Sequence, residues 1–470
     1  MAIGFPARAF HTPAKCKYNS GTGEGAMRQL ELEIITAEPS VRVLTASAYR
    51  EQLATLLAGD LNFHGQNSAY ASHNYHAFPA KFPPQLPRRF IEGLTAPGDI
   101  VLDPMAGSGT TIVEAFLNGR HGIGMDLDPL ALQLGRVKTT PLNVEAAAEA
   151  GFAVIREAQE LCQKQPHTLQ EQLDQRFKPE ERAFIDYWFA PAVQLELIAL
   201  LSEIERTEDP KIRAFLELVF SAVIITKSGG VSLARDLAHT RPHRVSDKAS
   251  RSALVEFSKR LKKNLESATE LSFDMPAPHF IHGNAMALPL PDDKMDLIVT
   301  SPPYASNAID YMRAHKFSLV WFGHTLQQLS DLRSQYIGHD AVQGFSLLPL
   351  PNAVQEIVEA VAQVDSKKAQ TLHRYYSEAT CFLSEMCRVL KPGRAAIVVV
   401  GSSVMRGIDT QTDRCLAEIG KAVGFAEATI AVRRLDRDKR MMPARSQEKA
   451  ATSLIEARMH EEYIIAFYKG

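Results

Sequence analysis

The chain has 470 residues, of which 45% are apolar and 23% charged, as in an ordinary soluble globular protein. No uninterrupted apolar run approaches the ~20 residues that cross a bilayer, which excludes an integral membrane protein. The formal net charge of −2 gives no overall attraction to nucleic acid, so any such contact must come from local basic patches.

Length and cysteine usage further narrow the class of protein. A chain this long exceeds the size at which one core stops growing, so we expect one large domain with insertions, or two domains. The N-terminus has too short an apolar stretch for a signal peptide, and the five cysteines are scattered without metal-ligand spacing. We therefore expect a cytoplasmic protein, nucleoid-associated if bacterial, with reduced thiols and neither a zinc site nor a disulfide framework. Residues 1–70 show no clear chemistry and are predicted to be an N-terminal extension of unknown role.

An alternation of strand and helix patterns begins at residue 99. "DIVLD" (99–103) is typical of a buried parallel strand, "TTIVEAFLNG" (110–119) has helical spacing, and "HGIGMD" (121–126) is a second strand that ends on an acid. Asp128, directly before a proline, is the predicted N-cap of the next helix. Strand, glycine-rich turn, helix, strand and acid are the opening of a doubly wound, Rossmann-like α/β sheet.

The glycine-rich turn "DPMAGSGTT" has the composition of a ligand-binding loop. Gly107 and Gly109 let backbone approach a ligand, and the following helix offers free N–H groups. It is not a phosphate-binding P-loop, because the Lys-Ser/Thr of that motif is absent. Asp103 can accept from an amine or anchor the turn, and Asp126 is placed to bind both hydroxyls of a ribose. This chemistry suits a cationic nucleoside without phosphate, such as S-adenosylmethionine; a structural turn without ligand remains the alternative.

The alternation stops between residues 137 and 271, where the pattern is largely helical. We predict a helical insertion there, which divides a catalytic domain into residues 71–136 and 272–470. A second, looser stretch covers residues 305–369. The remaining expected elements are strands at 279–285 and 295–300, an amphipathic helix at 374–393, a buried strand at 395–401, and an antiparallel hairpin of 428–434 with 462–470 that closes the sheet.

The turn "TSPPY" follows the strand at 295–300, at the edge where parallel sheets bind ligands. Ser301 offers a hydroxyl oxygen and Pro302 a carbonyl oxygen, and the di-proline holds both rigidly. Two such acceptors can grip the hydrogens of an exocyclic amine while Tyr304 stacks on the base, and positioning then supplies most of the rate. A rigid strand-terminating turn also explains the two prolines.

Taken together, "LDPMAGSGTT", "GIGMDLDP" and "DLIVTSPPY" resemble the S-adenosylmethionine-dependent DNA amino-methyltransferases, and "SPPY" is most similar to those that act on cytosine N4. The resemblance includes "FPAKFPPQLPRRFI" and "LKPGRAAIVVVG", and it covers roughly residues 72–134 and 280–470. It implies duplex DNA as partner, with the target base flipped out of the stack. It does not decide whether a cognate restriction or defence nuclease is a partner, or what the oligomeric state is.

The resemblance also implies roles for individual residues. The target base is held by the turn residues Ser301, Pro302, Pro303 and Tyr304. The cofactor is bound by residues of four motifs, namely Phe78, Lys81, Asp103, Met105, Gly107, Ser108, Gly109, Thr110, Asp126 and Asn284.

Two features depart from the family pattern. The helical insertion lies where no standard subgroup places one, so residues 137–271 and 305–369 are both candidates for target recognition. Asn284 stands where the family often has Asp near the adenine, although Asn still offers a donor and an acceptor.

Other functions compete with cytosine-N4 methylation of DNA. Adenine N6 is the next candidate, because pocket size decides between the bases. Guanine-N2 methylation of RNA uses a related "PPY" turn, and methylation of a protein glutamine is similar chemistry, but its relatives have Asn where Ser301 stands. A non-catalytic scaffold that binds nucleic acid is the remaining alternative.

Three basic stretches can contact phosphates: 234–244, 258–264 and 433–445. Arg241, Arg244, Arg433 and Arg434 are the predicted nucleic-acid contacts. For any one stretch alone, a solvated surface is the more common explanation. The histidines of the first stretch lack further ligands, and no metal is expected.

Overall fold

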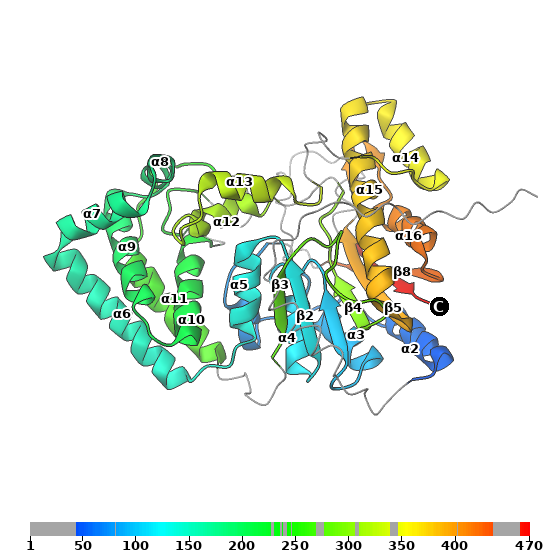
Figure 1. Cartoon of the computed structure of the whole chain (residues 1–470), viewed down its shortest axis with the longest axis horizontal. Helices are drawn as coiled ribbons and strands as arrows, with labels where there is room; N and C mark the ends of the chain where they lie inside the picture. The colour runs from blue at the N-terminus through cyan, green and yellow to red at the C-terminus, as the bar shows by residue number, and fades with distance from the viewer. Residues whose placement is uncertain are drawn as a thin grey trace, which may run out of the picture.

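In the computed structural model, seven strands of the described residues form one mixed sheet with helices on both faces (Figure 1). The described residues are 44–79, 81–226, 230–235, 237, 242–245, 247–268, 277–305, 310–338, 346–401, 403–435 and 461–470. The strand order is β3-β2-β1-β4-β5-β9-β8. The strands are β1 (Ile100–Asp103), β2 (His121–Asp126), β3 (His279–His282), β4 (Met295–Thr300), β5 (Leu390–Gly401), β8 (Glu427–Arg434) and β9 (Glu461–Tyr468).

Strands β1 to β5 are parallel, and β9 runs antiparallel between β5 and β8. The sheet confirms the predicted Rossmann-like fold, and the pairing of β8 with β9 confirms the C-terminal antiparallel hairpin. The order reverses between β1 and β4, so a crevice opens at their carboxyl ends. Asp103 and Asp126 end their strands there, and Ser301 directly follows β4.

The strands are apolar along their length because both faces of the sheet are covered. One face packs on α2 (Ala46–Ala58), α3 (Gln85–Leu94) and α4 (Thr110–Leu117), with Val101, Leu297 and Ile397 in that core. The other face packs on α15 (Ser366–Val389) and α16 (Thr412–Val423). Helix α2 therefore belongs to the sheet layer, although its residues fall within the extension expected before residue 71.

A second body of helices lies beyond the β3 edge, which confirms the predicted helical insertion (Figure 1). It consists of α6 (Val144–Lys164), α7 (Pro166–Arg176), α8 (Pro179–Trp188), α9 (Pro191–Glu205), α10 (Pro210–Ile224) and α11 (Ala253–Ala268). Four of these helices begin with proline, which suits the first helical position because its missing N–H has no intrahelical partner. Helix α5 (Pro129–Lys138) lies between this body and the sheet (Figure 1).

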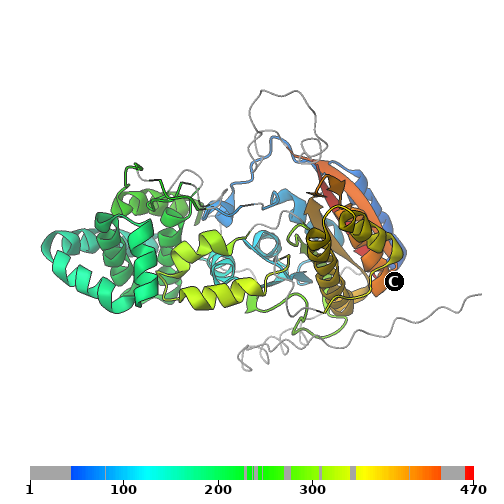
Figure 2. The ribbon, with the colours of Figure 1, turned by 90° about the horizontal axis from the view of Figure 1, so that it is seen from above.

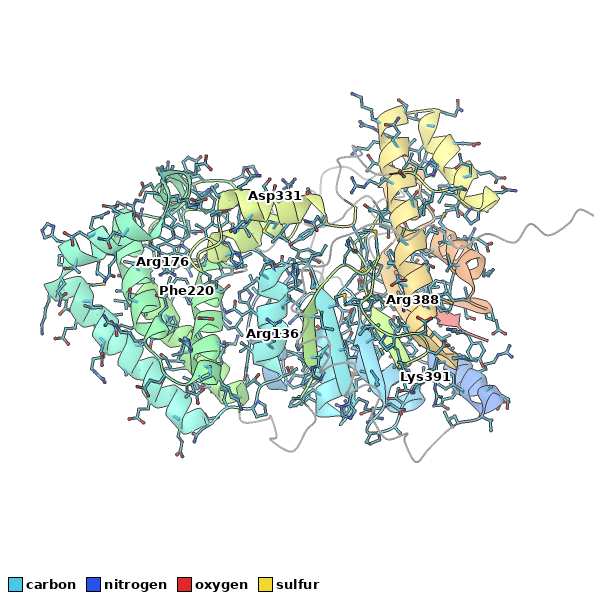
Figure 3. All side chains as sticks on the ribbon, viewed as in Figure 1. Arg136, Arg176, Phe220, Asp331, Arg388 and Lys391 are labelled. Atoms are coloured by element: carbon cyan, nitrogen blue, oxygen red, sulfur yellow. The ribbon has the colours of Figure 1, made fainter. Side chains whose placement is uncertain are left out.

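The stretch expected to be loose contains helices: α12 (Met312–Leu319), α13 (Leu326–Ser334) and α14 (Asn352–Ala362). Figure 2 shows α12 and α13 between the helical body and the sheet. Trp321, just after α12, is fully buried against Phe177, Phe189 and Phe220 of the helical body. Arg176 donates to the Trp321 carbonyl from the same body, where Figure 3 labels it. Aromatic packing therefore holds α12 against the insertion.

In the described part of the chain, no single helix is long and apolar enough to span a membrane. Helices α8 and α9 reach that length and apolarity only as a pair, which is bent by 119°.

Candidate active site

A cavity of about 750 Å³ opens at the carboxyl ends of β1, β2 and β4. Its walls include all four residues of the "SPPY" turn and nine of the ten predicted cofactor residues: Phe78, Lys81, Asp103, Met105, Gly107, Ser108, Thr110, Asp126 and Asn284. Motifs far apart in the sequence therefore meet in one cavity.

Gly107 forms part of the wall of this cavity. Its φ of 49° is left-handed, and its N–H donates to Asp126 Oδ2 at 2.8 Å. A Cβ at this position would lie 3.4 Å from the ring of Phe78, so the ring packs directly on the glycine. The turn is thus fixed between the acid of β2 and an aromatic face.

Gly109, the tenth predicted residue, is not among the residues that line the cavity. It has a φ of 76°, and a Cβ there would lie 3.1 Å from the Cα of Gly135 on α5. Its place is the close contact between the turn and α5. Behind the turn, the fully buried Lys138 donates from Nζ to the Ser108 carbonyl at 2.6 Å, and burial lowers its pKa well below the usual value.

The two predicted acidic residues, Asp103 and Asp126, are held in place by hydrogen bonds, and both have raised pKa values. Asp103 Oδ1 accepts from the Thr300 hydroxyl at 2.7 Å and from the Met105 N–H at 3.2 Å. Burial raises the pKa of Asp103 to about 7. Burial also raises the pKa of Asp126 to about 6, and the adjacent Asp128 raises it further. Both carboxylates would be stabilised by a cationic ligand in the cavity.

Asp128 has the predicted capping role and a second one. Its Oδ1 accepts from the N–H groups of Leu130 and Ala131, which confirms the N-cap. Its Oδ2 accepts from His315 Nδ1 at 2.6 Å and from the Tyr336 hydroxyl at 3.0 Å. Burial acts to raise the pKa of Asp128, but His315 and Tyr336 together hold it below its usual value. Asp128 thus ties the end of β2 to the segment that contains α12 and α13.

In the turn, the Ser301 hydroxyl donates to the Val399 carbonyl of β5 at 2.9 Å. Since its only hydrogen is used there, the Ser301 oxygen can act toward a ligand in the cavity only as an acceptor. The Tyr304 hydroxyl donates to Glu462 Oε1 of β9 at 3.2 Å, and its ring lies against Gly401. The serine and the tyrosine are therefore each anchored by a neighbouring strand.

Asn284 supplies an unused donor. Its Oδ1 accepts from the Met286 N–H at 2.9 Å, whereas its buried Nδ2 has no partner. A buried amide nitrogen without a partner is costly unless a ligand accepts from it, as a ring nitrogen of adenine would. Together with the Gly107 cradle and the acids, this atom fits the adenosine and methionine parts of S-adenosylmethionine.

The predicted nucleic-acid contacts do not line the cavity. Arg241 lies outside the described residues. Arg244 is exposed on the helical body with its guanidinium over the Tyr187 ring, and Arg434 is exposed at the end of β8. Arg433 is only 5% exposed and faces Glu462, with 3.4 Å between Nη1 and Oε2. A surface phosphate contact is therefore the wrong role for Arg433, because its side chain lies inside the protein.

Several lining residues were not expected from the sequence, namely Asp310, Tyr311, Arg313, Arg333 and Tyr336. Tyr311 stacks on Phe78, with ring centroids 4.9 Å apart and 26° between planes. These residues come from the stretch without a clear pattern, and no local signal marks them. One general indication that these residues line the cavity was present in the sequence, because residues that closely follow "TSPPY" in the chain must lie near the same crevice.

Residues 59–135 match the family model described as DNA methylase, of the N6 and N4 type. This segment is similar to the N6/N4 DNA methylase family. The match contains Phe78, the glycine turn and both acids. The family implies S-adenosylmethionine as the methyl donor, in agreement with the cavity. It does not distinguish cytosine N4 from adenine N6.

Curated relatives extend the similarity beyond residues 59–135. The Type II methyltransferase M.MvaI of Kocuria varians is 25% identical over 393 residues, which cover 77% of this chain and 83% of the relative. The Type II methyltransferase M.AvaI of Nostoc sp. is 24% identical over 360 residues, 69% of this chain and 73% of the relative. The DNA adenine methyltransferase YhdJ of Escherichia coli is 39% identical over 66 residues, 14% of this chain and 22% of the relative.

Proposed function

We propose that the chain is a DNA methyltransferase that moves a methyl group from S-adenosylmethionine to the exocyclic amine of a flipped base, most simply cytosine N4. The observation that carries the proposal is the joint placement of the "SPPY" turn and the glycine turn in one cavity. The names of the relatives M.MvaI and M.AvaI, both Type II methyltransferases, support a DNA substrate and a role in restriction and modification.

The residues of the chain divide into two groups in this proposal. The cofactor half consists of Phe78 against one side of the ligand, Asp103 near its ammonium, Asp126 at its ribose and Asn284 at its adenine. When bound, S-adenosylmethionine supplies an electrophilic methyl group on a positively charged sulfur. Lys81 lies at the edge of this half, where its Nζ donates to the His73 carbonyl at 2.6 Å.

In the target half, the Ser301 oxygen and the Pro302 carbonyl accept the two hydrogens of the base amine. Accepting both hydrogens draws the nitrogen lone pair away from the ring, so that it can attack the methyl carbon. The amine nitrogen would take the methyl group as its bond to sulfur breaks, the thioether would leave as a neutral product, and the amine would lose one proton to solvent. Tyr304 stacks on the base, held by Glu462, so that the chain contributes mainly positioning.

Target recognition is proposed for the helical body and for the segment of α12 to α14. Arg313 of α12 and Arg333 of α13 line the cavity, and the exposed Arg244 on Tyr187 belongs to the helical body, which lies beyond the β3 edge of the sheet in Figure 1. Base flipping costs a few kcal/mol, which contacts to the DNA backbone must offset.

Adenine N6 is a second candidate, because YhdJ, named a DNA adenine methyltransferase, is 39% identical over its matched 66 residues. The deciding experiment treats mixed duplex DNA with the full chain and labelled S-adenosylmethionine, followed by nucleoside mass spectrometry. N4-methylcytosine supports the first candidate and N6-methyladenine the second. Ser301→Ala should reduce the product at least about tenfold, because it removes one hydrogen bond to a polarised amine. Label on RNA or protein alone would refute the proposal.

A further inference from the structure

An ionic cluster at the cavity has no part in the chemistry described above. We call it the Asp310 cluster; it consists of Asp310, Arg313 and Arg333. The Nε of Arg333 lies 2.7 Å from Asp310 Oδ2, and the Nε of Arg313 lies 2.8 Å from the same oxygen. All three residues line the cavity. Two guanidinium groups thus converge on one carboxylate oxygen beside the site.

The cluster carries excess positive charge. One carboxylate faces two arginines, and Lys316 on α12 is close enough that both arginines act on it. Burial lowers the pKa of Lys316, and Arg333 and Arg313 lower it further, whereas Asp310 opposes them. The cluster therefore has a net positive potential that an anion would neutralise.

The arginines also have donors to spare. Asp310 uses the Nε of each arginine and one terminal nitrogen of Arg333. Within the described residues, the Nη1 of each guanidinium has no protein acceptor. The side chains of Arg313 and Arg333 are 35% and 37% exposed, against 17% for Asp310. The carboxylate is thus more covered than the arginines, whose unused N–H groups are open to a ligand.

We propose that the Asp310 cluster binds a backbone phosphate of the nucleotide whose base enters the cavity. Guanidinium forks match phosphate oxygens in a bidentate manner. In base flipping the base rotates inward while its backbone stays outside, so a phosphate is expected at the rim. The cluster is close in sequence to the target turn, since six residue steps from Tyr304 to Asp310 span at most about 20 Å. The inference rests on the proposed function, because it needs a nucleotide as substrate.

Two different roles compete with phosphate binding. The cluster can be a brace that only joins α12 to α13, in which case its loss lowers stability alone. It can also hold the carboxylate of the cofactor, in which case its loss weakens cofactor binding without DNA. The partial exposure of both arginines favours a ligand that stays at the rim, whereas Phe78 and Asp103, which are proposed to bind the cofactor, are both buried.

The test compares Arg313→Gln and Arg333→Gln with the wild-type full chain. The matched control is Arg406→Gln, because Arg406 also pairs with one aspartate, Asp365 at 2.8 Å, but does not line the cavity. For each protein, three quantities are measured: the melting temperature, the Kd for S-adenosylmethionine without DNA, and the Kd for a duplex DNA pool across a salt series.

We expect each cluster variant to raise the Kd for DNA about tenfold or more and to reduce the slope of log K against log salt by about 1. Cofactor affinity should remain within about twofold of wild type, and the control should match wild type in both Kd values. Arg313→Lys should restore the salt slope but only part of the affinity, because Lys keeps the charge and loses the fork.

An unchanged DNA Kd and salt slope would overturn the inference, whether the variants lose only melting temperature or only cofactor affinity. If wild type methylates DNA and the slopes are unchanged, the inference fails alone and the proposed function stands. If wild type neither methylates nor binds DNA, the proposed function fails first, and the inference falls with it.

Discussion

Gly401, the last residue of β5, leaves room for the Tyr304 ring and should be essential for activity. A Cβ at this position would lie 2.6 Å from Tyr304 Cε2 and 2.8 Å from Cδ2. Carbon atoms in contact prefer about 3.5–4.0 Å, so Gly401→Ala must displace the ring by about 1 Å. The Tyr304 hydroxyl is tethered to Glu462, which limits how the ring can turn away.

A displacement of about 1 Å in a positioning group can reduce the rate about 10²-fold. We therefore expect Gly401→Ala to lower the single-turnover rate of methyl transfer by about this factor, with the Kd for S-adenosylmethionine unchanged. Overpacking also costs about 1–3 kcal/mol of unfolding free energy, which thermal denaturation would detect.

Gly407→Ala is the matched control. Gly407 has a φ of 85° and nothing within 4 Å of its added Cβ, so its replacement strains the backbone without touching Tyr304. The reasoning is refuted if Gly401→Ala, shown to be folded, transfers methyl groups at the wild-type rate. It is equally refuted if Gly407→Ala loses as much activity, since loss of stability would then explain both.

The cavity and its supports lead to three more predictions. Without cofactor, Asp103, whose pKa burial raises to about 7, contributes most stability below the ordinary carboxyl pKa of about 3.9 and loses that contribution as the pH rises to 7. Asp103→Asn should therefore flatten the pH dependence of the melting temperature between about pH 4 and pH 7. Asn284→Leu should weaken S-adenosylmethionine binding about tenfold in calorimetry, because it removes the unpaired Nδ2 donor, and unchanged binding would contradict the adenine contact. Gly135→Ala should destabilise the fold by about 1–3 kcal/mol, because its Cβ would lie 2.0 Å from the Phe280 ring, and an unchanged unfolding midpoint would contradict that packing.

Where the sequence pattern is local, the prediction of the fold succeeds. The β1 strand, the glycine turn and the acid of β2 lie within 30 residues and follow from period and turn chemistry alone. Gly109 shows the limit of that reasoning. A glycine in a ligand-binding turn can serve the ligand or the packing behind it, and only the 3.1 Å approach to Gly135 shows that this one packs on α5.

The stretch from 305 to 369 was harder to predict because its helices depend on distant partners. Helix α12 packs on α5 and on α10 of the insertion, and the adjacent Trp321 is buried among aromatics of the insertion. Arg313 and Arg333 are separated by 20 residues and meet only because α12 and α13 pack together. Tertiary contacts of this kind produce no hydrophobic periodicity that the sequence could reveal.

Arg433 and Arg434 show that the role of a basic run depends on whether its residues lie on a strand. Adjacent residues of a strand point to opposite faces, so both arginines of β8 cannot contact the same DNA backbone. The structure buries Arg433 beside Glu462, which accepts the Tyr304 hydroxyl. The cation that the sequence suggests for phosphate thus lies behind the target turn, beside the carboxylate that anchors Tyr304. Activity should therefore depend on Arg433 through the orientation of Tyr304, whereas the exposed Arg434 can affect only binding.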